Sequence, residues 1–229
     1  MAKKQKVTRK QLLKEPDKVL TFTSKIFKFI MENKIYIGGA LCTLLILLSL
    51  VAIVGYFSEQ AENRATSELA DVKNKYEESL KENDAVAAAK EVKADFEEII
   101  KSAVGKEAGK QAKVILANIC YKAGEFEQSA SLYKSAVPDF SDRPVMKNLI
   151  LAGLGYSYEG NKKYENAIES FEKMASSTEL INKAEVLFNL GRLYEKADQP
   201  EKSKELYQKI INNYEDFVFV DLVKEKLAG

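Results

Sequence analysis

The apolar residues of the chain are distributed in two different ways before and after Phe57. From Ile35 to Phe57 the sequence reads IYIGGALCTLLILLSLVAIVGYF, 23 residues without a charge. A helix of that length rises about 34 Å, which spans a hydrocarbon core of roughly 30 Å. Beyond Phe57 charged residues are frequent, and Ala, Glu, Lys and Leu, which favour helix, dominate. The sequence therefore predicts an all-α chain with one N-terminal transmembrane helix at residues 35–57.

The length and the flanks of this run separate a membrane span from a signal peptide. The apolar part of a signal peptide has about 7–15 residues and begins near the first residue. This run is longer, begins at residue 35, and is followed by Ser58-Glu59-Gln60-Ala61, which lacks a small-x-small cleavage site. Tyr36 and Tyr56 lie near its ends, where aromatic side chains favour the membrane interface. We expect an uncleaved anchor and not the core helix of a soluble domain.

Charge is distributed unevenly about the run. Residues 1–34 carry ten Lys or Arg and three Asp or Glu, whereas residues 58–77 carry only three basic residues. Residues 58–229 carry 25 basic and 31 acidic residues. The positive-inside rule predicts that residues 1–34 form a basic cytoplasmic arm and that the large domain lies across the membrane. In a bacterium this is a single-pass protein of the inner membrane with a periplasmic domain.

The arm itself has an amphipathic stretch at residues 17–34. In a helix, its apolar residues share one face (Val19, Phe22, Ile26, Phe29 and Ile30) and its charged residues the other (Lys18, Lys25, Lys28 and Glu32). Such a helix would lie at the inner leaflet with its lysines near anionic lipid. A solvated basic tail that only sets topology fits equally well. Membrane lipid is thus an expected partner of residues 35–57 and of the arm.

A repeated pattern occupies residues 105–214. A Leu-Gly or Leu-Ala pair is followed three residues later by Tyr or Cys, then by a second small residue, an aromatic residue and an apolar residue. The small residue of the pair recurs at positions 117, 155 and 191, in steps of 38 and 36. The three sets are Leu116, Ala117, Cys120, Gly124, Phe126, Ser129, Tyr133 and Ala136; Leu154, Gly155, Tyr158, Tyr164, Ala167, Phe171 and Met174; and Leu190, Gly191, Tyr194, Pro200, Ser203, Tyr207 and Ile210.

This pattern resembles the tetratricopeptide repeat, in which two antiparallel helices form each unit. Small residues let the two helices approach closely, and the aromatic residues fill the space between them. Each pair of helices leaves an apolar face open, so neighbouring repeats complete the core and form a solenoid. The expected packing residues are Ala117, Tyr133, Gly155, Tyr158, Ala167, Phe171, Gly191, Tyr194, Ser203 and Tyr207.

Weaker patterns flank the three repeats. Residues 58–104 are predicted as a helical stalk and a degenerate first repeat, with an apolar stripe at Ala65, Leu69, Val72, Tyr76 and Leu80. A helix is expected at 84–104, with Asn83 or Asp84 as its cap and Val92, Phe96 and Ile99 as its buried face. Residues 215–229 are predicted as a capping helix that begins at Asp216 and buries Phe217, Val220, Val223 and Leu227.

The resemblance implies that the first helix of each repeat lines a protein-binding groove. The candidates at the matching positions are Asn118, Tyr121, Tyr156, Glu159, Phe188, Asn189 and Arg192, with Val114, Ala152 and Glu195 beside them. Tyr, Phe and Arg are residue types that anchor protein contacts. The alternative is that these side chains only pack the groove or a terminal helix.

Several kinds of chemistry find no support in the sequence. There is no His, which removes His-based catalysis and His metal ligands. The two Cys, Cys42 and Cys120, are not expected to pair. No phosphate-binding loop, Cys/His cluster or nucleophile elbow occurs, and the acidic domain argues against nucleic acid. We expect no catalytic residues, no metal and no cofactor, and interpret the chain as a non-enzyme.

The whole layout is similar to the YfgM-type family of ancillary Sec translocon subunits, which have a basic arm, one N-terminal span and a periplasmic tetratricopeptide domain. The resemblance implies a scaffold that docks at the Sec translocon and engages periplasmic chaperones or secreted chains. A scaffold for another envelope machine, such as cell division, outer-membrane assembly, secretion or pilus apparatus, is the alternative. The oligomeric state stays open.

Overall fold

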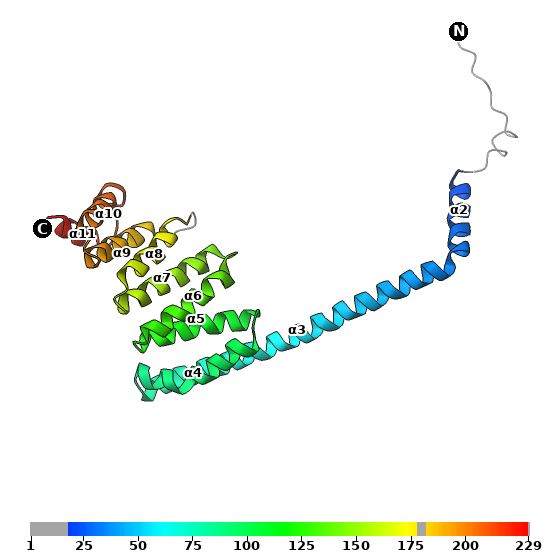
Figure 1. Cartoon of the computed structure of the whole chain (residues 1–229), viewed down its shortest axis with the longest axis horizontal. Helices are drawn as coiled ribbons and strands as arrows, with labels where there is room; N and C mark the ends of the chain where they lie inside the picture. Colours follow the sequence, from blue (N-terminus) through cyan, green and yellow to red (C-terminus); the bar gives the residue numbers. More distant parts are fainter. Residues whose placement is uncertain (1–17, 178–181, 229) are drawn as a thin grey trace, which may run out of the picture. The chain divides into compact units, whose positions relative to one another are not determined.

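A computed structural model describes residues 18–177 and 182–228, and these residues are almost entirely helical (Figure 1). Helix accounts for 86% of the structure, and none of the described residues forms a strand. The elements are α2 (Lys18–Glu32), α3 (Lys34–Glu82), α4 (Ala85–Ser102), α5 (Glu107–Lys122), α6 (Phe126–Ala136), the 3-10 helix η1 (Val137–Phe140), α7 (Pro144–Gly160), α8 (Tyr164–Ala175), α9 (Lys183–Lys196), α10 (Pro200–Asn213) and α11 (Val220–Ala228).

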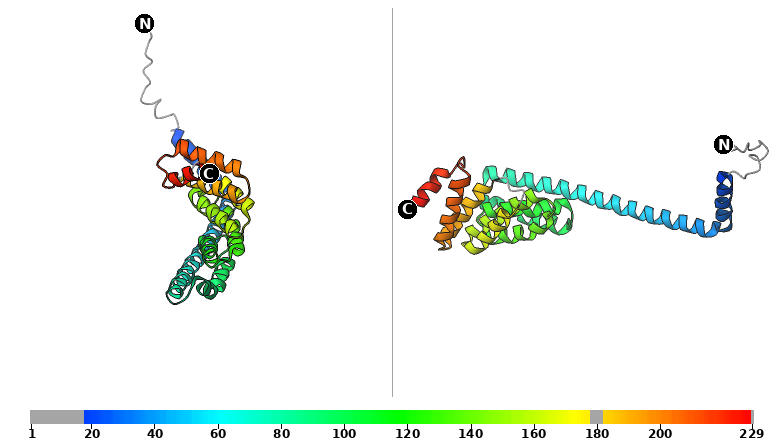
Figure 2. Two further views of the ribbon diagram at one scale, coloured as in Figure 1. Left: turned by 90° about the vertical axis from the view of Figure 1, so that its left-hand side faces the viewer. Right: turned by 90° about the horizontal axis from the view of Figure 1, so that it is seen from above.

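The chain divides into two compact units, with the boundary between Glu59 and Gln60. The first unit contains α2 and the N-terminal part of α3, which are separated by Asn33 and set at a steep angle to one another (Figures 1 and 2). The apolar window of α3 is entirely exposed. By length and composition α3 is able to cross a membrane, and it is the one helix among the described residues that meets this description.

The second unit is a stack of antiparallel helical pairs that follow one another in chain order (Figures 1 and 2). The C-terminal part of α3 pairs with α4, and α5 with α6, α7 with α8 and α9 with α10 follow. Buried residues form four clusters, each shared between neighbouring pairs or the terminal helix, and the partly buried Leu132, Tyr158 and Leu206 each pack against two of them. The predicted all-helical solenoid is confirmed.

The C-terminal part of α3 is held to the solenoid by apolar and polar contacts. Ala65, Leu69 and Tyr76 are buried in the first core cluster, as the stripe predicts. The prediction for Leu80 is wrong, because its side chain is exposed. Ser79 is buried in its place, and its hydroxyl donates to a carboxylate oxygen of Glu91 at 2.7 Å.

Glu62 links α3 to the start of α5. Its two carboxylate oxygens accept hydrogen bonds from the backbone N–H groups of Glu107 and Ala108, at 3.1 and 2.9 Å. The first N–H groups of a helix have no partner within the helix, and a carboxylate also interacts favourably with the positive end of the helix dipole. Glu62 lies five residues after Phe57. Its hydrogen bonds therefore attach α3 to the solenoid from that point of the helix onward.

Glycines set the closest approach between the helices of the second and third repeats. A Cβ atom at Gly155 would lie 2.5 Å from the ring of Phe171, and one at Gly191 would lie 2.5 Å from the ring of Tyr207. Both rings are almost completely buried. Only a residue without a side chain allows this contact, so these two glycines have the packing role predicted from the sequence.

The ends of two helices differ from the prediction. Helix α4 begins after Asp84, whose carboxylate accepts a hydrogen bond from the Ala87 N–H, but it ends at Ser102, short of residue 104. The C-terminal helix begins at Val220 and not at Asp216, because residues 214–219 form turns. Val223 is buried, whereas Val220 and Leu227 are only half-buried.

Candidate protein-binding groove

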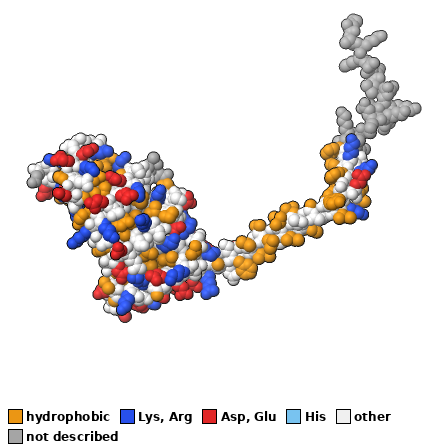
Figure 3. Space-filling model, in the orientation of Figure 1, with side chains coloured by type: hydrophobic (Ala, Val, Ile, Leu, Met, Phe, Trp, Pro, Cys, Tyr) orange, Lys and Arg blue, Asp and Glu red, His pale blue; other side chains and the backbone are white. Residues whose placement is uncertain are grey.

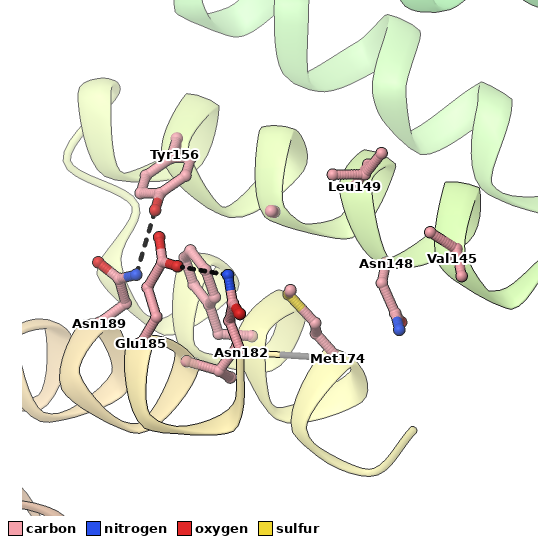
Figure 4. Close-up of a pocket in the computed structure, with 11 residues that line it drawn as sticks. Val145, Asn148, Leu149, Tyr156, Met174, Asn182, Glu185 and Asn189 are labelled. Atoms are coloured by element: carbon pink, nitrogen blue, oxygen red, sulfur yellow. Dashed lines mark hydrogen bonds between the residues drawn. The ribbon is translucent and has the colours of Figure 1, made fainter. Parts of the chain in front are cut away.

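A cavity of about 330 Å³ opens between α7 and α9, with α8 at its base (Figure 4). Its wall is mostly apolar, and amide and carboxylate groups lie at intervals along it. The lining residues are Val145, Asn148, Leu149, Ala152 and Tyr156 from α7, Phe171 and Met174 from α8, and Asn182, Glu185, Val186 and Asn189 from the start and body of α9.

The face of α7 that lines the cavity is a helical stripe of Val145, Leu149, Ala152 and Tyr156. These positions are separated by four, three and four residues, so they lie above one another on one side of the helix. Val145 is 50% exposed and Leu149 is 61% exposed. Two large apolar side chains of the cavity wall are therefore at least half exposed, which is the feature that most clearly indicates a binding surface.

Polar groups gather at the Tyr156 end of the cavity (Figure 4). The side-chain amide of Asn189 donates to the Tyr156 hydroxyl oxygen at 3.1 Å, and the amide of Asn182 donates to a Glu185 carboxylate oxygen at 3.3 Å. Burial raises the pKa of Tyr156, and the nearby Glu185 carboxylate raises it further. Tyr156 is thus a neutral hydroxyl, and the Glu185 carboxylate gives this end of the cavity a negative group.

One helical turn further on, an ion-pair cluster joins α7 to α9. Arg192 donates to both carboxylate oxygens of Glu159, at 2.6 and 3.0 Å, and Lys196 donates to the same carboxylate at 2.7 Å. Burial alone would raise the pKa of Glu159, but the hydrogen bonds from Arg192 and Lys196 outweigh it and lower the pKa. Because each group satisfies the other, Glu159 and Arg192 hold the two helices together and do not offer free charges to a partner.

The remaining predicted groove residues lie outside this cavity. Asn118 is exposed on α5, and its side-chain oxygen accepts a hydrogen bond from the Tyr133 hydroxyl at 2.6 Å. Tyr121, also on α5, packs edge-to-face on Phe126 with ring centroids 5.5 Å apart. Neither side chain lines the cavity. Tyr133 has its predicted packing role, since it is buried in the second core cluster.

Phe188 is placed differently from its prediction as a groove residue. It is buried on the side of α9 that faces the C-terminal segment, where it stacks on Phe219 and contacts Tyr207 and Phe217. Its ring is 5.6 Å from that of Phe219, centroid to centroid. Phe188 therefore packs against the chain that follows α10 and does not line the cavity.

The prediction missed residues that contribute most of the cavity wall. Of the residues named as groove candidates, only Ala152, Tyr156 and Asn189 line it. The missed set comprises Val145, Asn148, Leu149, Met174, Asn182, Glu185 and Val186. The signal for α7 was present in the sequence, since Val145 and Leu149 continue the stripe of Ala152 and Tyr156 toward the N-terminus of the same helix.

The chemistry of the cavity suits an extended polypeptide. Side-chain amides such as Asn148, Asn182 and Asn189 can both donate and accept, as a peptide backbone does. Leu149 and Met174 offer an apolar contact for a side chain of the ligand. Among the described residues, no group of three or more His, Cys, Asp or Glu is placed to hold a metal ion.

Two stretches of the sequence match a profile of the tetratricopeptide repeat. These are residues 150–177, which contain most of α7 and all of α8, and residues 185–216, which contain most of α9 and all of α10. The first expected repeat, which has Ala117 where the others have glycine, falls outside both matched ranges. No curated protein sequence matches the chain.

Solved structures with similar folds are tetratricopeptide-like. The nearly identical TPR-like repeats of a Podosopora anserina protein described as a kinesin light chain match with a TM-score of 0.55 and 13% identity, covering 73% of this chain and 85% of the other. BtubC (BKLC) from P. vanneervenii matches with a TM-score of 0.53 and 12% identity, covering 74% and 81%. At such low identity the likeness shows the fold alone.

The stacked helical pairs and the groove between successive first helices define an α-helical repeat protein of the protein-interaction class. Residues 150–177 and 185–216 match the tetratricopeptide repeat, and together with the similar solved folds they support a tetratricopeptide repeat protein. Its repeats indicate a scaffold for protein–protein interaction, a fold that is typically not enzymatic.

Proposed function

We propose that the chain is a membrane-anchored interaction scaffold of the bacterial envelope. The exposed apolar part of α3 crosses the inner membrane, residues 1–34 lie in the cytoplasm, and the repeat unit lies in the periplasm. The scaffold docks at the Sec translocon and presents its groove to periplasmic chaperones or to secreted chains.

The observation that carries this proposal is that α3 is one helix from Lys34 to Glu82. The same helix provides the exposed apolar run and, from Ala65 onward, buried side chains of the solenoid core. Glu62 adds hydrogen bonds to the start of α5. A span that continues directly into the core of a binding domain supports a domain held at the membrane surface, where chains emerging from a translocon are within reach.

The occupant that the groove fits best is an extended, largely apolar segment of an incompletely folded protein. Leu149 and Met174 provide apolar contact, and the amides of Asn148, Asn182 and Asn189 match backbone groups. Glu185 adds a preference for a positively charged residue in the segment over a negatively charged one. Secreted chains have this combination before they fold, because their apolar segments are still exposed.

Photo-crosslinking in native membranes tests this function directly. A benzoylphenylalanine at Leu149 of the full chain places the reactive group in the groove. The matched control carries it at Val86 of α4, which is also an exposed apolar side chain but lies outside the cavity. Adducts are identified by mass spectrometry after mild solubilisation.

The proposal predicts adducts with periplasmic chaperones or secreted chains from Leu149 and not from Val86, together with copurification of the Sec channel in both cases. Adducts with cell-division or outer-membrane assembly proteins, without the channel, would contradict docking at the translocon. Equal adducts from the two positions would contradict the groove as the docking site.

A further inference from the structure

We infer that α2 lies in the plane of the membrane surface and binds anionic lipid headgroups. This inference rests on the proposed membrane span of α3. It gives the N-terminal helix a function of its own, since it fixes where the span begins and makes that position depend on the lipid.

The first observation is the uncovered apolar surface of α2. Phe22, Ile26, Phe27, Phe29, Ile30 and Met31 are all exposed large apolar side chains. Soluble proteins rarely expose so many together unless the patch meets a protein or a membrane. Phe22, Ile26, Phe29 and Ile30 follow the three- and four-residue spacing of one helical face, so the patch is continuous along the helix.

The second observation is the charge on the remaining face of α2. Lys25, Lys28 and Glu32 form a strip on the side of α2 opposite Ile30, and Lys28 forms only a loose, exposed pair with Glu32 at 3.9 Å. With ten basic and three acidic residues in 1–34, the local excess is positive. A helix with an apolar face and lysines on its polar face is suited to the boundary between acyl chains and anionic headgroups.

The third observation is that α2 ends before the span begins. Asn33 separates α2, which ends at Glu32, from α3, which begins at Lys34. Its backbone N–H keeps the helical hydrogen bond to the Phe29 carbonyl at 3.0 Å, and its side-chain amide donates to the same carbonyl at 2.9 Å. Glu32 and Lys34 flank this junction, and charged groups at that depth belong at the interface and not in hydrocarbon. The α2 helix is therefore a separate element beside the membrane surface and not a first turn of the span.

Figure 3 shows apolar side chains on the surface of both helices of the first unit. The basic side chains of this unit lie on α2 and at its junction with α3. Exposed apolar residues surround α3, as a span requires, whereas on α2 they cover a broad face and leave a charged strip at Lys25, Lys28 and Glu32. The lipid bilayer is the occupant that fits both arrangements, because it offers hydrocarbon on all sides of a span and on one side of a surface helix.

Tryptophan fluorescence tests this inference without background, because the chain has no Trp. Full chains carrying Phe29→Trp, Lys28→Trp or Ile46→Trp are placed in nanodiscs of phosphatidylcholine alone or of phosphatidylcholine with phosphatidylglycerol. Emission wavelength, quenching by iodide and quenching by lipids brominated at defined depths are measured. Lys28→Trp is the matched control on the polar face, and Ile46→Trp reports on the span itself.

We expect Phe29→Trp to emit at shorter wavelength and to be quenched by shallow bromine labels, while Lys28→Trp is quenched by iodide. The contrast should be larger with phosphatidylglycerol. Replacing both Lys25 and Lys28 by Gln should lower the ratio of bound to unbound α2 about 25-fold, on the order of fivefold for each lysine.

Equal iodide quenching at positions 28 and 29 would overturn the inference and leave a solvated arm. Quenching of Phe29→Trp by deep labels would overturn it in favour of a longer span. If Ile46→Trp is quenched by deep bromine labels, either of these results leaves the membrane anchor intact. Quenching of Ile46→Trp by iodide would contradict the anchor itself.

Discussion

The apolar run of α3 and the paired helices of the repeats are built from the same kinds of residue, arranged in opposite ways. In the run, Leu, Ile and Val face outward on every side of the helix and none is buried. In α7 and α9, Leu154, Leu190 and Leu193 are buried, and the partly buried charges of Glu159 and Arg192 are paired with one another. Both regions are equally helical, so the difference lies in what surrounds the helix.

With the proposed membrane location of the run, this difference fits one region to lipid and the other to water. Burial against neighbouring helices stabilises the repeats, and they need small residues such as Gly155 to let those neighbours approach. The run of α3 has glycines at 38, 39 and 55 with open space around them, so they have no such packing role within the described chain. The same substitution should therefore have different effects in the two regions.

Charges introduced into the two regions should give the largest difference. Replacing Leu47 and Val51 by Arg places two charges near the centre of the proposed span, at a cost of about 5–7 kcal/mol in membrane insertion. Replacing Val86 and Val104 by Arg is the matched control, because these valines are also exposed but lie in the repeat unit. The exposed fraction is 57% for Val86 and 72% for Val51. Alkaline carbonate extraction should show loss of the first variant from membranes and retention of the second. Retention of both would contradict a lipid environment for α3.

Removal of a buried aromatic ring is expected to have the next largest effect. Phe171→Ala removes a ring that is almost completely buried between α8 and α7, and should lower the free energy of unfolding by about 3–5 kcal/mol. Phe57→Ala removes an exposed ring and should leave it unchanged. Urea denaturation of the full chain in detergent, followed by circular dichroism, measures both. A similar loss in the two variants would mean that Phe57 also packs on the repeats.

The packing positions of the repeats were predictable because their spacing is local. Gly155 and Phe171 are sixteen residues apart, as are Gly191 and Tyr207, and this spacing alone brings each pair together in a helical hairpin. The contact of Glu62 with the start of α5 spans 45 residues and has no periodic signal. The position of Phe188 was also not predictable from the sequence, since it depends on how residues 214–219 turn back over α9.

The candidate groove was only partly predictable for a related reason. Matching positions in the repeats identified Tyr156 and Asn189 as side chains of one face. They gave no indication of which repeats would leave that face open. The cavity depends on the spacing between α7 and α9, whereas Asn118 and Tyr121 at equivalent positions of α5 contact residues of their own repeat.

A methyl group added at a glycine should give a smaller difference between the two regions. Gly191→Ala places a Cβ atom 2.5 Å from the Tyr207 ring, a clash that costs about 1–3 kcal/mol, while the better helix propensity of Ala returns about 1 kcal/mol. Gly39→Ala meets no atom within 4 Å and should leave both insertion and unfolding unchanged. Thermal unfolding of the two full-length variants distinguishes them, and a higher midpoint for Gly191→Ala than for Gly39→Ala would contradict the close approach of α9 and α10.

The smallest expected effect is an acid dependence confined to the repeats. Hydrogen bonds from Arg143 lower the pKa of Glu107 from 4.5 to about 2. Because the folded-state pKa is below the unfolded value, the pair stabilises the fold above about pH 4.5, and this contribution is lost as the pH falls toward 2. The side chains are 38% and 42% exposed, so the contribution is that of a surface pair.

Glu107→Gln should therefore make the decline in unfolding free energy shallower between pH 4.5 and 2, and insertion of α3 should not change. Arg143→Gln should remove the same part of the curve, since it removes the partner that lowers the pKa. Urea titrations at a series of pH values measure this, and curves parallel to that of the unaltered chain would show that the pair makes no contribution.

The most direct test of the account is the side of the membrane on which each part lies. In a full chain with Cys42 and Cys120 replaced by Ser, a single Cys is introduced at Thr8 in the arm or at Ser131, an exposed residue of α6. Bacterial spheroplasts are treated with a membrane-impermeant maleimide before and after permeabilisation. The account predicts that Ser131→Cys is labelled in both samples and Thr8→Cys only after permeabilisation. Labelling of both positions, or of neither, in intact spheroplasts would contradict a single span that carries the repeats across the membrane.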